Sequence, residues 1–462
     1  MNGVHFQAVS DSSLPSTASG AVTQGAPHPH PPVVGTRLPA GEGNARVGVS
    51  SADGIARATT KSSRLIWGLS VGHGVKHFCQ SAWLIIMPEL RAALSLSDIA
   101  VGGIFTVQQV AGGVTNVPAG VLTDMFRRRV ALMLTLSMLS VATGYMLIGI
   151  SGWYWLVLIA GAVMSTGASW WHSPAIASLV TRYPEKRGFA VAMHLTGAQA
   201  GDTISPVVVG LLLGGISLWA IEWSGLEWRT VALLVMAPAA ATAVAVMLLM
   251  GRSGDAEKHI TFRQYLRSSA RLARNRGVLM MTGVHALRGA AHSSFTLFLV
   301  LYMADVLGYS QRAQGAHVAL LTVAGIVSTP IMGRISDRLG RKPVIVTAMG
   351  IGTTLLLSFL WADSGWQMAL MLGLLGTVLF AVMPIIAAAA MDATEKGSEG
   401  TSTALLFAGG SVIGAVAPLA AGAINTSWGF HGVVWMAAGL SLAGAGLAVV
   451  ATRARRPLVV AS

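Results

Sequence analysis

Gly333-Arg-Ile-Ser-Asp337-Arg-Leu-Gly-Arg-Lys342 is the stretch that decides the fold, a short charged loop between two long apolar segments. About 210 residues earlier the chain carries a related loop, Gly120-Val-Leu-Thr-Asp124-Met-Phe-Arg-Arg-Arg129. Further matches share this offset within three residues: His73 with His285, Lys76 with Arg288, Pro174 with Pro384, and Glu185-Lys186 with Glu395-Lys396. Matches in several registers at one offset predict that the chain consists of two related halves.

The composition is typical of a membrane protein. Of the 462 residues, 53% are hydrophobic and 11% are charged, whereas soluble domains carry about 25% charged residues. The single cysteine, Cys79, excludes a disulfide within the chain. The formal charge of +13 is spread over short clusters between apolar segments, as the positive-inside rule requires. We therefore expect a monomer embedded in the lipid bilayer, with no nucleic-acid partner.

About twelve apolar segments are long enough to cross a hydrocarbon core of about 30 Å. They cover residues 64–90, 97–123, 129–150, 153–180, 187–217, 228–250, 277–304, 311–335, 342–362, 366–391, 400–424 and 430–451. Basic residues gather in the tails and in alternate loops, which places both termini in the cytoplasm of a bacterial cell. The loop at 392–399 is the exception, because Lys396 stands there against three acidic residues.

The segments divide the chain into five parts. Residues 1–62 are rich in Ser, Gly, Pro and Ala without apolar periodicity, which predicts a disordered tail. The longest internal connection is cationic and separates two sets of six segments. We therefore expect a tail at 1–62, a six-helix bundle at 63–250, a cytoplasmic connecting loop at 251–276, a second six-helix bundle at 277–452 and a cytoplasmic tail at 453–462.

The loop from Gly333 to Lys342 resembles the signature loop of the major facilitator superfamily, which joins the second and third helices of each half. In the first half, Met125 stands in place of the usual Arg and Arg127 in place of the usual Gly. The resemblance covers residues 64–456. It implies an all-α membrane fold of about twelve helices in two pseudo-symmetric six-helix bundles. It also implies a secondary transporter that works by alternating access, without enzymatic activity or cofactor.

The same loop predicts a charged latch in both halves. An Asp near a helix end can pair with a neighbouring Arg, and the pair can favour one conformation. An ordinary solvated turn between helices is the alternative. The latch candidates are Gly120, Asp124, Arg128, Gly333, Asp337, Arg338, Gly340 and Arg341.

A looser resemblance is to the fosmidomycin-resistance branch of that superfamily. Three short motifs carry it: Val71-Gly-His73-Gly-Val-Lys-His, Trp171-His172-Ser-Pro174-Ala, and Gly197-Ala-Gln-Ala-Gly201-Asp-Thr-Ile-Ser-Pro206. This resemblance implies efflux as the direction of transport.

Two basic pairs lie deep in apolar segments, His73 with Lys76 and His285 with Arg288, each at i, i+3 spacing on one helix face. Lys76 lies twelve residues past Arg64, a rise of about 18 Å, which is near the bilayer midplane. Arg288 lies at a matching depth. A cation there costs about 2.5–3.5 kcal/mol on insertion scales. We expect both cations to face a wet cavity or a counter-charge, and to face each other across the central cavity.

Further polar residues extend these pairs into a predicted solute site. The substrate-binding candidates are His73, Lys76, His77, Gln108, Gln109, His172, His285, Arg288 and His292. Asp202 is the clear acid at this depth, so positive charge is in excess and predicts a small organic anion: a carboxylate, a phosphonate or an organophosphate. In position the two cations resemble those of organophosphate–phosphate antiporters. Anion exchange, or protons carried by Asp202 or His194, would drive transport.

Other functions remain open at this point. The chain fits a broad drug or antibiotic efflux pump whose basic residues serve coupling, or a non-transporting sensor on the same fold. We reject a zinc site formed by His73 and His77, because Lys76 between them would repel a dication. Cys79 is solitary and the chain has no phosphate-binding loop, so we expect neither an enzyme nor a metal centre.

Overall fold

The computed structural model describes residues 51–219, 221–250, 263, 267, 270–271, 274–362, 365–394 and 399–451. Most of the predicted N-terminal tail, most of the connecting loop and all of the C-terminal tail therefore lie outside the described residues. The first helix, α1 (Ser51–Ala93), begins inside the segment that the sequence assigned to the tail.

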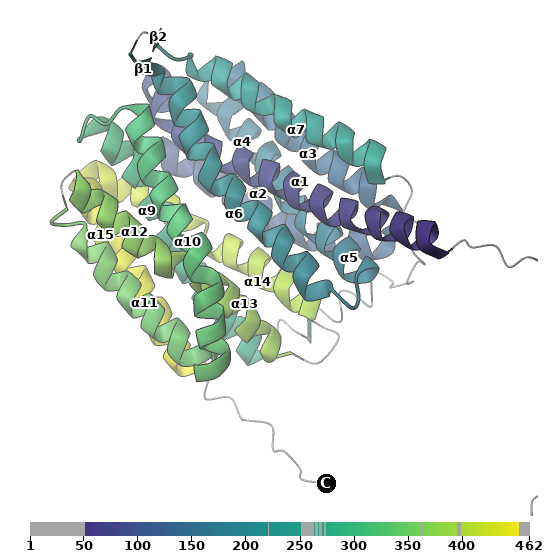
Figure 1. Ribbon diagram of the computed structural model, residues 1–462. Helices are drawn as coiled ribbons and strands as arrows, with labels where there is room; N and C mark the ends of the chain where they lie inside the picture. Colours follow the sequence, from purple (N-terminus) through teal and green to yellow (C-terminus); the bar gives the residue numbers. More distant parts are fainter. Residues whose placement is uncertain are drawn as a thin grey trace, which may run out of the picture. The chain divides into compact units, whose positions relative to one another are not determined.

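The rest of the first half is helical apart from one short hairpin (Figure 1). Its elements are α2 (Asp98–Met125), η1 (Arg127–Arg129), α3 (Val130–Gly149), α4 (Tyr154–Trp170), α5 (His172–Arg182), α6 (Arg187–Gly214), β1 (Ile216–Leu218), β2 (Ile221–Trp223) and α7 (Trp228–Met250). Strands β1 and β2 pair antiparallel, with Ile216 opposite Trp223.

The second half repeats this order of helices. Its elements are α9 (Arg276–Asp305), α10 (Gln311–Leu339), α11 (Arg341–Ser358), α12 (Trp366–Leu379), α13 (Val382–Asp392), α14 (Glu399–Gly414) and α15 (Val416–Ala451). Inside α15, Gly429 has φ 64° and ψ −169°, so two helices meet there without a loop. The eleventh predicted span therefore runs from α14 into α15, and the twelfth is the remainder of α15.

The fourth span of each half is broken at the same place. Helix α4 ends at Trp170, just before Pro174, and α12 ends at Leu379, just before Pro384. A proline has no backbone N–H, so the carbonyl four residues earlier loses its partner and the helix is weakened there. The shared break is a structural form of the repeat seen in the sequence.

Five helical stretches are long and apolar enough to cross a membrane on length and composition alone: Arg127–Gly149, Trp228–Met250, Gln311–Leu339, Trp366–Asp392 and Ala404–Ala451. The predicted spans in α1, α2, α4–α5, α6, α9 and α11 fall outside this group. Of these, α1, α2, α6 and α9 carry polar or charged side chains in their middle, which lowers their mean hydropathy. The helices that carry the predicted solute-binding residues, α1, α2, α5 and α9, all fall outside the group of five.

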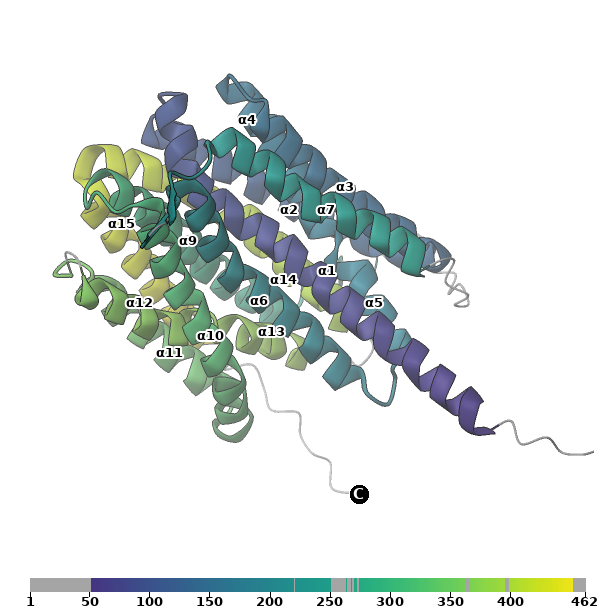
Figure 2. The same cartoon turned by 45° about the horizontal axis from the view of Figure 1, so that its top comes forward.

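Helices of the two halves pack directly on one another. Figures 1 and 2 show α6 beside α10, and α2 also contacts α14 and α15. Small residues allow this approach. A Cβ at Gly315 of α10 would collide with the carbonyl of Pro206 in α6, and one at Gly102 of α2 would collide with the carbonyl of Pro418.

Polar side chains join the halves at one end of the helices. Arg91, near the end of α1, pairs with Asp98 of α2 at 2.9 Å and also with Asp305 at the end of α9. Further contacts at this end are Gln311 to Glu89 at 2.6 Å and Asn425 to Asp98 at 2.8 Å. The predicted orientation would make this the non-cytoplasmic end, where these contacts connect the two halves.

Candidate solute-binding site

Close packing of α1 on α6 creates the site. A Cβ at Gly197 would collide with the carbonyl of Ser70, and one at Gly201 would collide with the carbonyl of Gly74. These two glycines lie one turn apart on α6, so the backbones approach over a whole turn. The approach brings the polar face of α1 against Asp202 of α6.

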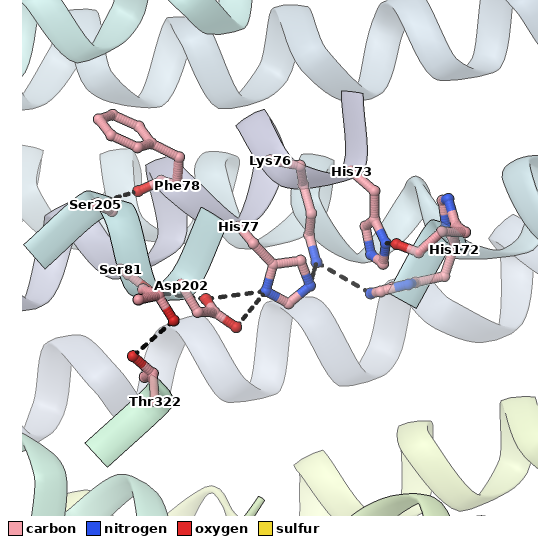
Figure 3. A network of polar contacts seen from close by, with 11 residues as sticks. His73, Lys76, His77, Phe78, Ser81, His172, Asp202, Ser205 and Thr322 are labelled. Atoms are coloured by element: carbon pink, nitrogen blue, oxygen red, sulfur yellow. Dashed lines mark hydrogen bonds and ion pairs between the residues drawn. The ribbon is translucent and has the colours of Figure 1, made fainter. Parts of the chain in front are cut away.

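A hydrogen-bonded chain runs through this contact (Figure 3). The Nζ of Lys76 lies 3.1 Å from Nε2 of His77 and 3.1 Å from Nε2 of His172. The Nδ1 of His77 lies 3.0 Å from an Asp202 oxygen, and Ser81 donates to the same carboxylate at 2.7 Å. An ammonium only donates, so Nε2 of His77 accepts and its Nδ1–H donates to Asp202. These hydrogen bonds thus link the ammonium, the imidazole and the carboxylate, and each donor points toward the carboxylate end.

Burial divides this chain into an inner and an outer part. Lys76 is 1% exposed, whereas the side chains of His77 and Asp202 are 22% and 21% exposed. The carboxylate is therefore the accessible end, and the ammonium lies behind it. Because a buried cation needs a counter-charge, Asp202 compensates Lys76 through His77 in this conformation.

Two further histidines lock α1 to α6 beside the chain. The rings of His73 and His194 are stacked, with centroids 3.9 Å apart and planes 10° apart. The Nδ1 of His73 donates to the backbone carbonyl of His194 at 2.8 Å, and the Nδ1 of His194 donates to that of Leu69 at 3.2 Å. Each Nε2 atom is buried without a partner among the described residues.

Arg288 has a different environment in the second half. Its guanidinium donates to the backbone carbonyl of Leu379, the last residue of α12. It borders a cavity of about 20 Å³, lined also by Met349, Leu375 and Ser441, which is room for about one water molecule. All of these residues belong to the second half. The sequence led us to expect Lys76 and Arg288 to face each other, but each cation is bound within its own half.

The two halves meet at an aromatic ring near the same depth. Phe407 of α14 stacks on His172 at 6.4 Å between centroids and contacts His285 edge-on at 5.4 Å. His292 lies edge-on to Phe380 at 5.2 Å. Phe407 thus connects the predicted site residues of both halves. The sequence does not point to Phe407, because an aromatic residue in an apolar span carries no signal of its own.

The two glutamines lie on α2, apart from this cluster. Gln108 is buried against Gly161 of α4, and Ser165 donates to its backbone carbonyl at 2.6 Å. Gln109 is half-buried on α2. Ser81, which is not among the predicted site residues, contacts Asp202 directly. Its i, i+4 relation to His77 was the available signal.

The two predicted latch loops differ in structure. Gly340 has φ 93° and links α10 to α11 directly, a conformation that favours glycine. Arg127 occupies the matching place in the first half, where the chain forms the 3₁₀ turn η1 instead. Asp337 pairs with Arg341 at 2.5 Å, and Asp124 pairs with Arg127 at 3.5 Å.

Only some latch candidates take part in these pairs. Arg341 also reaches Asp392 at the end of α13, at 3.4 Å, so it connects three helices of the second half. Within the part of the chain that the structure describes, no ion pair is recorded for Arg128 or Arg338. Gly333 has open space at its Cβ position.

Comparisons with known proteins agree with this architecture. A sequence profile of the Major Facilitator Superfamily matches residues 69–313 and 281–461. The fosmidomycin resistance protein of Escherichia coli K12 is 24% identical over 301 residues, 63% of this chain and 70% of that protein. A chloramphenicol efflux pump of Mycobacterium tuberculosis is 28% identical over 324 residues, 67% of this chain and 73% of that protein.

Solved structures share the fold at low identity. A bacterial homologue of the human lysosomal transporter Spinster, in an inward-facing and occupied conformation, superposes with a TM-score of 0.70 at 14% identity, covering 85% of this chain and 97% of that one. The nucleoside transporter NupG superposes with a TM-score of 0.68 at 10% identity, covering 84% of this chain and 100% of that one.

These observations define a multi-pass, all-α membrane protein built from two repeated halves, with a polar cluster in the middle of its helices. That is the class of secondary transporters. The chain belongs to the Major Facilitator Superfamily.

Proposed function

We propose that this transporter exports small organic molecules across the bacterial cytoplasmic membrane by alternating access, and that solutes with an anionic group fit its site best. Export is supported by its relatives in Escherichia coli and Mycobacterium tuberculosis, whose names denote resistance and efflux. The anionic class is supported by the site itself.

The cluster of Lys76, His77, Asp202 and His172 carries the proposal. Two basic side chains, Lys76 and Arg288, lie deep in the described helices, where Asp202 is the one deep acid. Asp202 already supplies the counter-charge of Lys76 through the hydrogen bonds of His77. An anionic group that approaches from the exposed side of the cluster can take over this role, because the ammonium needs a counter-charge and is indifferent to its source.

The protein offers an aromatic surface to the body of the solute, beside the place where its anionic group would bind. Phe407 of the second half stacks on His172 of the first. A solute bound here contacts both halves, so its affinity changes when the halves move relative to each other. A ligand shifts a conformational equilibrium only through such differential contacts. Asp202 and His194 remain our candidates for a proton carrier, with anion exchange as the alternative drive.

A thermal-shift screen of the purified full chain tests the solute class. Carboxylates, phosphonates and sugar phosphates are compared with their neutral amide or alcohol counterparts at equal concentration. A ligand present at 100 times its Kd stabilises the folded state by about 2.7 kcal/mol. We expect anions to raise the unfolding temperature and the neutral counterparts to leave it unchanged.

Transport is then measured in inside-out membrane vesicles, where an exporter accumulates its solute. We expect accumulation of the anions that stabilise the chain, and its loss in Lys76→Met. Equal accumulation of anionic and neutral solutes would instead favour the broad drug efflux pump, the second candidate that the relatives support. Binding without accumulation would favour a sensor.

A further inference from the structure

Three imidazoles of the first half converge on one point. His73 and His77 of α1 and His172 of α5 each offer a ring nitrogen, and these three nitrogens lie within 4.8 Å of one another. The rings meet edge to face, with centroids of His73 and His77 4.7 Å apart and those of His73 and His172 5.1 Å apart. Figure 3 shows the three rings around the end of the Lys76 side chain.

Two of these rings are held from behind. The Nδ1 of His77 donates to the Asp202 carboxylate, and the Nδ1 of His73 donates to the backbone carbonyl of His194. These contacts leave the Nε2 lone pair of each ring free to bind a cation. A carboxylate or carbonyl behind the second ring nitrogen is the usual support of a metal-ligating histidine. The Nε2 of His73, a residue only 1% exposed, has no partner among the described residues.

A cation already occupies this place. The ammonium of Lys76 lies 3.1 Å from Nε2 of both His77 and His172. Lys76 is therefore a cation tethered between two of the three imidazoles, those of His77 and His172, beside the ring of His73. The sequence argued against a metal because Lys76 would repel it. In the structure, the ammonium and a metal ion would compete for the same position.

We propose that His73, His77 and His172 form a transition-metal site of the Zn²⁺ class, whose resident cation is Lys76. Imidazole nitrogen is a preferred ligand of Zn²⁺, Ni²⁺ and Cu²⁺. Zn–N bonds of about 2.0–2.1 Å bring tetrahedral ligands to about 3.3 Å from one another. The nitrogens must therefore close by up to about 1.5 Å, within reach of small ring rotations. The flexible lysine stem can carry the ammonium away.

The fourth position of such a site is open. His77 and its Asp202 partner are partly exposed, while His73 is enclosed. A metal held by three histidines would therefore meet water, or an anion, on the His77 side. Three protein ligands with an open fourth position are typical of reactive zinc sites rather than structural ones.

Zn²⁺ binding to the purified full chain tests the proposal. His5, His28 and His30 of the N-terminal segment are first replaced by alanine, so that they add no sites. Isothermal titration then compares this background with Lys76→Met, which removes the resident cation at similar length. Co²⁺ absorption in the visible range serves as a second probe, because its intensity reports tetrahedral coordination. We expect Lys76→Met to bind one Zn²⁺ at least tenfold more tightly than the background.

Two further variants decide the ligands. In the Lys76→Met chain, His172→Ala should weaken Zn²⁺ binding by at least tenfold, whereas His431→Ala on the exposed part of α15 should leave it unchanged. Unfolding temperatures of all variants identify any chain that is not folded, and Lys76→Ala replaces Lys76→Met in that case. The proposal is overturned if removal of Lys76 does not tighten binding, or if His172→Ala changes nothing. Solute is absent throughout, so the result is independent of the proposed export function.

Discussion

Charge compensation between Lys76 and Asp202 can be measured as a coupling energy. Asp202→Asn keeps the shape of the side chain and an oxygen that accepts from His77 and Ser81, but it removes the negative charge. The ammonium of Lys76, 1% exposed, then lacks a counter-charge. Lys76→Met removes the other member of the pair, so the Asp202 carboxylate and His77 are left without a cation. Each single change is therefore expected to destabilise the folded state.

The magnitude follows from burial. Breaking a fully buried ion pair by removing one partner costs about 3–5 kcal/mol. The Asp202 side chain is 21% exposed, and His77 lies between the two charges, so we expect about 1–3 kcal/mol for each single variant. The double variant Lys76→Met/Asp202→Asn removes both charges. It should cost less than the sum of the single variants by at least about 1 kcal/mol.

Equilibrium unfolding of the four chains in mixed detergent micelles gives the required free energies. The matched control pairs Asp202→Asn with Arg64→Met, which removes a basic side chain at the exposed start of the same span. The control pair should be additive within about 0.5 kcal/mol. Additivity of the Lys76 and Asp202 variants as well would refute the idea that the carboxylate compensates the ammonium through His77.

Three other changes test the structure at separate places. Gly201→Ala should lower the yield of folded protein sharply, because its Cβ would collide with the backbone of α1, whereas Gly188→Ala on the same helix has open space and should not; size-exclusion chromatography compares them. Arg91→Ala removes the contact to Asp305 and should increase labelling of cysteines introduced at that end of the helices; unchanged labelling would show that the contact does not hold it closed. Arg288→Met should lower the unfolding temperature, because it removes the donor for the carbonyl of the buried Leu379 at the end of α12, and an unchanged temperature would show that the carbonyl needs no donor.

The fold could be predicted from the sequence because its signals are local and repeated. The loop from Gly333 to Lys342 and its earlier counterpart fixed the superfamily, and the resemblance to the fosmidomycin-resistance branch is supported by the relative in Escherichia coli. The depth of Lys76 followed from a simple count along a helix. Such features depend on position along the chain, which a sequence displays directly.

The directions of the side chains could not be predicted in the same way. Lys76 and Arg288 occupy matching positions, yet one head group contacts two imidazoles and the other a backbone carbonyl. The difference depends on which side chain the neighbouring broken helix presents. His172 opens α5 in the first half, whereas its counterpart in the second half, Val382, has no acceptor to offer. Only a three-dimensional arrangement shows this consequence.

The helix breaks explain why both halves carry a deep cation. The last carbonyls of a helix lack intrahelical partners and lie at the negative end of its dipole. In the second half Arg288 donates to such a carbonyl, that of Leu379, so its charge serves the broken helix directly. In the first half Lys76 instead contacts His172, the first residue after the break, and its charge reaches the accessible Asp202 through His77. The repeat therefore supplies two equivalent cations. By this reasoning the second cation supports its own half, and the first is the cation that our proposal assigns to the solute.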